Sequence, residues 1–302
     1  MNPSDPAKSL VIGTDKKRGL LVFDLEGKVL QELPHGSFNN VDVRKNVPNG
    51  AERMDVVLTE NRADNTLRLY RINRETLRLE AVPSAPIQSG VVVYGCSLFR
   101  PATTGKLYAI VGSKEGVAEQ WELVADGNGG FTGVLVRTLQ HGGQIEGMVG
   151  DDEANALFIG EEMAGIWKWD GDPTKAVAGT IVVPMAPGTP LDKADLEGLS
   201  IYRTGPKSGY LLASHQGRYR YLIYNREAPH EFITVFTIGG TETIDGVQET
   251  DGLDVTSEPV GPNYPTGMLV VQDGMNPGST QNFKFVPWTA LTAGNAVLQP
   301  AP

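Results

Sequence analysis

Short runs of alternating apolar and polar residues recur along the whole chain, separated by turns that contain Gly, Asn and Asp. Five of these runs open with Asn, Tyr, Glu or Asp, continue through a small residue in most copies, and then alternate as a strand. They occupy residues 39–43, 94–98, 146–148, 197–201 and 251–255. Their first residues stand 55, 52, 51 and 54 positions apart. A period near fifty residues is typical of the four-stranded blade of a β-propeller.

A second unit follows each of these runs and also stands once before the first of them. It consists of an apolar strand, a polar loop and a strand rich in aromatic and β-branched residues. The six copies begin at Leu10, Val56, Leu107, Leu157, Tyr210 and Met268. We therefore predict an all-β fold, a single six-bladed β-propeller domain over residues 1–302. Its first blade is expected to lack its N-terminal inner strand or to borrow it. A β-sandwich with accidental regularity is the alternative.

Composition agrees with this interpretation. The 302 residues include 36 glycines and 20 prolines, which suits many short strands joined by turns. Only residues 172–177 and 287–293 could form short helices. No apolar run is long enough to cross a membrane, and residues 1–9 lack the basic and apolar regions of a signal peptide. Cys96 lies in an apolar run and is expected to be a buried structural thiol.

The formal net charge of −10 disfavours nucleic acid and anionic membranes as partners, because both would be repelled. Metal cations are the partners that such a surface could attract. We expect a monomer with no nucleic-acid or membrane partner.

Polar residues gather at one end of the predicted inner strands. Equivalent positions of a propeller's inner strands form a ring at one face, which here would contain Asn39, Tyr94, Glu146, Glu197 and Asp251. Two further acids, Asp195 and Asp245, stand shortly before ring positions. The loops after the second strands add Lys16, Arg62, Lys114, Glu115, Glu161 and Glu162.

A ring of carboxylates requires bound cations. Two unit charges about 6 Å apart repel by roughly 3 kcal/mol at an effective dielectric constant near 20. More than four oxygen ligands, with no histidine or thiol among them, favour calcium over zinc or iron. The neighbouring Lys16, Arg62 and Lys114 suit a phosphate group, and Arg62 can make a forked contact with it.

At these residues the sequence resembles the β-propeller phytases, also called alkaline phytases. Matching segments occur in order through nearly the whole chain, among them residues 60–62 (ENR), 112–116 (GSKEG), 144–147 (QIEG), 195–199 (DLEGL), 250–255 (TDGLDV) and 281–288 (QNFKFVPW). The resemblance implies a secreted or periplasmic enzyme that hydrolyses phytate, or its calcium salt. Calcium ions would activate a water molecule that attacks phosphorus.

The resemblance also implies roles for individual residues. The phosphate-binding and catalytic residues would be Lys16, Arg62, Tyr94, Lys114 and Glu115. The catalytic calcium ions would be held by Tyr94, Glu146, Glu162, Asp195, Glu197 and Asp251. Structural calcium ions would be held by Asn40, Val41 through its carbonyl, Asp245, Asp273 and Gly274.

Two alternative functions remain open at this point. A propeller hydrolase of the lactonase kind, with one calcium ion, would not need Lys16, Arg62 and Lys114 together. A non-catalytic binding propeller is favoured by the incomplete first blade. Two other phosphatase chemistries are disfavoured, because the four histidines are scattered and no arginine stands six residues after Cys96.

Overall fold

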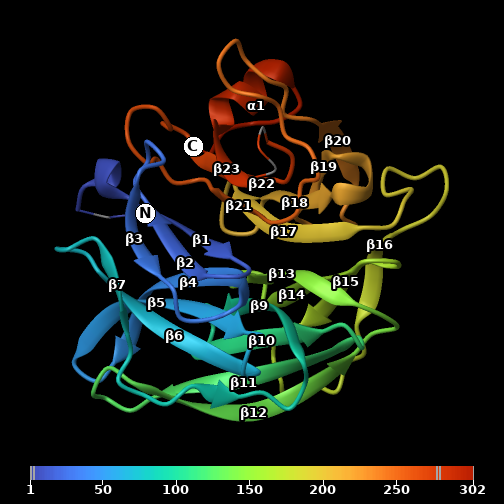
Figure 1. Cartoon of the computed structure of the whole chain (residues 1–302). Helices are drawn as coiled ribbons and strands as arrows, with labels where there is room; N and C mark the ends of the chain where they lie inside the picture. The colour runs from blue at the N-terminus through green and yellow to red at the C-terminus, as the bar shows by residue number, and fades with distance from the viewer. Residues whose placement is uncertain (1, 3, 277, 279, 302) are drawn as a thin grey trace.

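The computed structural model describes residues 2, 4–276, 278 and 280–301. Its antiparallel sheets lie in chain order around a central axis (Figure 1). The first sheet contains β1 (Val11–Asp15), β2 (Gly19–Phe23) and β3 (Val29–Leu33). The second contains β4 (Phe38–Asn49), β5 (Glu52–Asn61), β6 (Thr66–Asn73) and β7 (Arg78–Ala81), with β8 (Ile87–Gln88) also paired to β6.

The next three sheets each have four strands. The third contains β9 (Val93–Phe99), β10 (Leu107–Ser113), β11 (Val117–Ala125) and β12 (Phe131–Gln140). The fourth contains β13 (Ile145–Asp151), β14 (Ala156–Glu161), β15 (Gly165–Asp170) and β16 (Thr180–Pro184). The fifth contains β17 (Leu196–Arg203), β18 (Gly209–His215), β19 (Arg220–Asn225) and β20 (Phe232–Phe236).

The sixth sheet contains β21 (Leu253–Thr256), β22 (Met268–Asp273) and β23 (Asn282–Pro287), and is followed by α1 (Trp288–Gly294). Two 3-10 turns, η1 (Pro6–Lys8) and η2 (Gln216–Arg218), complete the described elements. The predicted six-bladed propeller is confirmed, and the sandwich alternative is excluded. The predicted short helix near residue 290 is present, whereas residues 172–177 form no helix.

The five predicted inner strands line the centre of the ring. β4, β9, β13, β17 and β21 each contact the next one along the chain, and β1 contacts β4. In the described part of the chain the first sheet has three strands, with β1 innermost, as the repeat predicts. A cavity of about 880 Å³ lies beside β1, lined by residues of β1, β4 and β21.

The first and sixth blades meet through side chains. Val11 and Leu25 pack with Val260, Tyr264 and Met268 in one apolar cluster. In the part of the chain that the structure describes, the sixth sheet has three strands, which the repeat did not predict. Trp288 of α1, which follows β23, packs against Tyr202 of β17 in the fifth sheet. The ring of Trp288 stacks 3.7 Å from that of Tyr202, between centroids, and is fully buried. Burial of such a side chain favours folding by roughly 2–3 kcal/mol.

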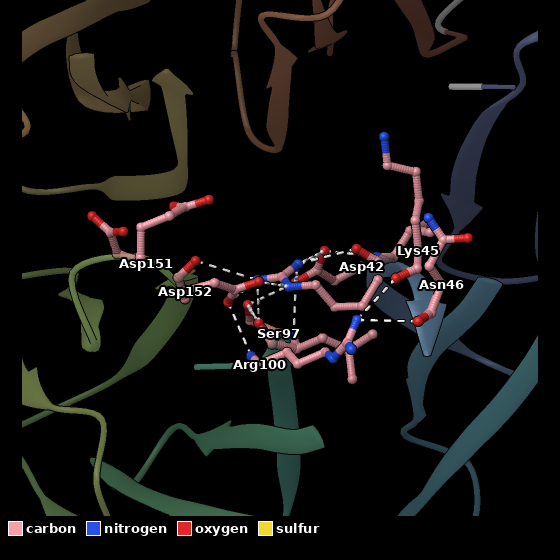
Figure 2. A network of polar contacts seen from close by, with 12 residues as sticks. Asp42, Lys45, Asn46, Ser97, Arg100, Asp151 and Asp152 are labelled. Carbon is pink, nitrogen blue, oxygen red and sulfur yellow. Dashed lines mark hydrogen bonds and ion pairs between the residues drawn. The ribbon is translucent and has the colours of Figure 1, made fainter. Parts of the chain in front are cut away.

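A partly buried ion-pair network ties three blades together at the end of the inner strands away from the predicted ring (Figure 2). Arg44 of β4 donates to Asp42 and to Asp152, each at 2.9 Å, and to the Leu98 carbonyl at 2.5 Å. The Ser97 hydroxyl donates to Asp42 at 2.8 Å. A guanidinium that is largely removed from water needs such pairing, so this network helps to fix the relative position of the second, third and fourth blades.

Among the described residues no helix is long and apolar enough to span a membrane. Cys96 is buried and free, as expected.

Candidate functional site

Three carboxylates from three blades converge at one mouth of the ring. Glu146 lies on β13, Glu197 lies on β17, and Asp251 precedes β21. Ligand oxygens of the three lie within 4.8 Å of one another. We call this group the inner acid cluster.

Glycines after the ring positions allow this convergence. A Cβ atom on Gly147 would lie 2.0 Å from the Glu197 carbonyl oxygen, and one on Gly95 would lie 2.2 Å from the Glu146 carbonyl oxygen. Real Cβ atoms do not approach so closely, so only glycine lets adjacent inner strands come together here. The small residue in the sequence repeat therefore has a structural cause.

The carboxyl groups of the inner acid cluster are buried close to one another, which disfavours their charged forms. Glu146 and Glu197 are only 3% and 6% exposed. Burial, with the charge of Asp251, raises the pKa of Glu146 to about 7, and burial together with Glu146 and Asp251 raises the pKa of Glu197 well above its ordinary value. The Glu197 Oε2 atom is buried with no hydrogen-bond partner. Bound cations would stabilise the charged forms of both glutamates, and would give Glu197 Oε2 a partner.

A second group, which we call the outer acid cluster, shares Glu197. Oxygens of Glu162, Asp195 and Glu197 lie within 4.8 Å of one another. Asp195 adopts a positive φ of 84°, and its backbone N–H donates to the Glu162 carbonyl at 3.1 Å. Gln144 donates to the Glu162 carboxylate. The two clusters together offer five carboxylates and no histidine or thiol, a donor set that fits calcium.

Cationic side chains stand beside the acids, as the sequence predicts. The Lys16 ammonium, in the turn between β1 and β2, lies 2.8 Å from Asp251 Oδ2. Burial opposes its charge, but Asp251, Glu146 and Glu197 raise the pKa of Lys16 overall. Around Tyr94, Lys114 Nζ lies 4.1 Å and Arg62 Cζ 5.0 Å from the ring centroid.

Tyr94 is close to both these cations and the acids. Burial and the charges of Glu146, Glu197 and Glu162 raise the pKa of its hydroxyl. Glu115 is exposed in the same turn as Lys114. The structure therefore brings Lys16, Arg62, Tyr94 and Lys114 to the mouth that holds the two acid clusters.

The remaining predicted calcium ligands are not members of either acid cluster. Asn40 and Val41 are on β4, where the Asn40 carbonyl accepts from the Thr59 hydroxyl at 2.7 Å. Asp245 and Asp273 are brought together in the sixth blade, with the Lys284 ammonium 2.6 Å from Asp245 Oδ1 and 3.1 Å from Asp273 Oδ2. Gly274 follows, its N–H donating to the Gln248 carbonyl at 2.8 Å. Structural calcium at these positions stays a prediction.

Two residues to which the sequence assigned no calcium-binding or catalytic role support the site directly. The Asn39 amide donates to Glu146 Oε1 at 2.5 Å and to the Tyr94 carbonyl at 2.7 Å. Glu60 is fully buried and accepts from the backbone N–H groups of Asn39 and Asn40 at 2.9 and 3.0 Å. The sequence repeat predicts the position of Asn39, because Asn39 is the first residue of the first run. Glu60 has no signal beyond its place just before Arg62.

Comparisons with known proteins agree with this geometry. The family described as Phytase matches residues 1–297. A curated relative, the 3-phytase of Bacillus subtilis (strain 168), is 41% identical over 295 residues, which cover 95% of this chain and 77% of the relative. A solved structure titled "Crystal structure of Nidogen/Laminin Complex" superposes with a TM-score of 0.56 at 12% identity, covering 92% of this chain and 93% of that one, and supports the fold alone. The chain therefore belongs to the phytase family.

Proposed function

We propose that this chain releases phosphate from phytate in a calcium-dependent reaction in which water attacks phosphorus. Family membership and the 3-phytase relative support phytate as the substrate. The observation that carries calcium dependence is the pair of acid clusters joined through Glu197, directly beside Lys16. A phosphate dianion cannot approach five bare carboxylates, so cations must offset their charge before substrate binds.

The residues that would hold calcium are Glu146, Glu162, Asp195, Glu197 and Asp251. Calcium, when bound, supplies positive charge that draws phosphate oxygens to the site and makes a nearby water more acidic. Repulsion between an anionic nucleophile and phosphate is one reason that the uncatalysed hydrolysis is so slow.

The cationic side chains of the site would bind the transferred phosphate. Lys16, Arg62 and Lys114 come from three different blades and face the same mouth. Arg62 can contact two oxygens at once, while the lysines act as point charges. Such contacts stabilise the charge that builds on the equatorial oxygens in the transition state. The raised pKa of Tyr94 keeps its hydroxyl protonated at neutral pH, so it can donate to an oxygen.

Phosphate release from phytate, measured with calcium and with excess chelator, tests the proposal. We expect release only with calcium, and a loss of at least tenfold in kcat/KM for Lys16→Met. Lys17→Met is the matched control, because Lys17 is exposed in the same turn with no side-chain partner among the described contacts. Release that persists in chelator would contradict calcium dependence, and lactone cleavage without phosphate release would contradict the substrate.

Export and oligomeric state are further parts of this proposal. The family resemblance supports a secreted or periplasmic protein, and we propose that it acts as a monomer.

A further inference from the structure

Asp195, one of the three acids of the outer acid cluster, adopts a backbone conformation that residues with a side chain rarely take. Its φ of 84° lies in the left-handed region, where the Cβ atom crowds a neighbouring carbonyl group. Such a conformation persists only where the surrounding contacts fix it. The Asp195 N–H donates to the Glu162 carbonyl, which holds the residue itself. The segment before it, residues 190–194, meets the turn between β18 and β19.

His215, the last residue of β18, contacts the chain on both sides of Asp195. Its side chain is fully buried, and its Nε2 atom lies 2.8 Å from the Lys193 carbonyl oxygen. A carbonyl oxygen only accepts, so Nε2 carries the proton and donates it to this bond. The backbone of His215 pairs with Leu196, which directly follows Asp195. A single buried residue thus holds the chain immediately before and immediately after Asp195.

Two further residues of the same turn hold the same segment. Arg220 donates to the Pro190 carbonyl at 2.7 Å and to Asp192 Oδ1 at 3.1 Å. Gly217 lies so close to Ala194 that a Cβ atom on it would stand 2.1 Å from the Ala194 carbonyl oxygen. The turn of residues 215–220 therefore contacts the segment at several points along its length.

The pairing of β17 with β18 is interrupted where Glu197 projects. Leu196 pairs with His215 and Leu199 pairs with Ala213, so two residues of β17 stand opposite one residue of β18. A bulge of this kind redirects a side chain, and here it lies at Glu197, the acid that the two clusters share. His215 is the paired residue next to this bulge, so it adjoins both acids that β17 and its preceding loop contribute to the outer acid cluster.

We propose that His215 is a positioning residue for the outer acid cluster. Its hydrogen bond to the Lys193 carbonyl keeps Asp195 in the left-handed conformation, in which the Asp195 carboxylate meets those of Glu162 and Glu197. The imidazole acts through the backbone of the loop. The consequence for calcium binding rests on the proposed function, whereas the effect on the loop itself does not.

Calcium titration by calorimetry tests the consequence for binding. His215→Leu removes the donor, and we expect calcium affinity to fall about tenfold. His215→Gln, which keeps an N–H donor, should recover most of it. His230→Leu is the matched control: His230 is also buried and contacts a backbone carbonyl, that of Asn225 at 3.1 Å, but at the opposite end of β19. It should lose stability and keep its calcium affinity. Unchanged affinity in a folded His215→Leu variant would overturn the proposal.

A double-mutant cycle tests whether His215 acts through Asp195. In the Asp195→Asn background, His215→Leu should lower calcium affinity by less than twofold, because the ligand that it positions is already lost. A further tenfold loss in that background would show that His215 acts by another route, and would overturn the proposal.

Amide hydrogen exchange in excess chelator tests the loop without calcium. The hydrogen bond of the Asp195 N–H to the Glu162 carbonyl should slow its exchange in the unmodified chain. We expect His215→Leu to speed this exchange at least tenfold, and His230→Leu to leave it unchanged. Gly217→Ala, which pushes on the loop through the contact described above, should also speed it and serves if His215→Leu does not fold.

Equal exchange in the variants and the unmodified chain would contradict the positioning role. If the unmodified chain binds no calcium, the proposed function fails, and the exchange measurement still decides whether His215 holds Asp195.

Discussion

Two buried oxygen atoms, one of Asn39 and one of Glu197, lack hydrogen-bond partners at the mouth of the ring. Glu197 Oε2 and Asn39 Oδ1 are both buried without a hydrogen-bond partner, and both residues stand at ring positions. A buried polar atom without a partner usually destabilises the fold by about 1–3 kcal/mol. The cation-free fold therefore carries a local destabilisation where cations are expected to bind.

The first prediction concerns Asn39. Its amide donates to Glu146 Oε1, and this hydrogen bond orients the Glu146 carboxylate within the inner acid cluster. Residues that orient metal ligands typically change metal affinity 10–100-fold when mutated. We expect Asn39→Leu to weaken calcium binding by about that factor, measured by calorimetry. Asn128→Ala, in an exposed hairpin turn, is the control. Unchanged affinity in a folded Asn39→Leu variant would show that Glu146 needs no such support.

At the scale of the strand, the glycines of the sequence repeat allow neighbouring inner strands to approach each other closely. Adjacent inner strands meet backbone to backbone beside Tyr94, Glu146 and Glu197, where a Cβ on the following glycine would lie within 2.7 Å of a backbone atom of the next strand. Gly147 illustrates this best, since its Cβ would also lie 2.8 Å from the Glu197 carbonyl carbon.

Gly147→Ala should therefore push β13 and β17 apart. We expect a loss of about 2–4 kcal/mol in the free energy of unfolding, and weaker calcium binding because Glu146 and Glu197 move with the strands. Urea denaturation measures the first effect and calorimetry the second. Gly239→Ala is the matched control, because a Cβ there meets nothing within 4 Å. Equal stability of the two variants would contradict this account of the repeat.

The periodic pattern predicted the inner strands and the ring because equivalent repeat positions must lie at equivalent places in a propeller. Glu146, Glu197 and Asp251 occupy equivalent positions in three blades, so the spacing of the repeat alone predicts that they lie close together. Contacts that break the repeat could not be predicted in this way. Lys284 between Asp245 and Asp273, and Glu60 beneath Asn39, depend on side-chain reach across loops that have no counterpart in the other blades.

At the scale of the whole molecule, pH and calcium should act on stability in opposite directions. A glutamate in the unfolded chain loses its proton near its ordinary pKa of 4.5, whereas Glu146 in the cation-free fold keeps it up to about pH 7. The unfolded state then binds fewer protons over this interval, so stability falls as pH rises. Calcium competes with the protons, and should remove most of this fall.

The test compares the unmodified chain with Glu146→Gln. Burial lowers the pKa values of His141, His215 and His230, so these histidines make stability rise with pH over the same interval. Because both proteins contain the three histidines, the comparison removes their contribution. In chelator, the stability of the unmodified chain relative to Glu146→Gln should drop by a few kcal/mol between pH 5 and pH 7.5, measured by urea denaturation. In calcium the difference should stay nearly level. A relative stability that rises with pH in chelator would contradict the raised pKa of Glu146.

The sharing of Glu197 between the inner and outer acid clusters has a kinetic consequence. Burial and the charges of Glu146 and Asp251 raise the pKa of Glu197 and so favour its protonated form in the cation-free fold. A first calcium ion, bound as proposed, would displace that proton, and a second would meet a carboxylate already ionised. The two proposed binding events are therefore linked, because the proton displaced by the first ion need not be displaced by the second. Activity should then rise with calcium concentration more steeply than a hyperbola, so that the enzyme switches on over a narrow range of free calcium.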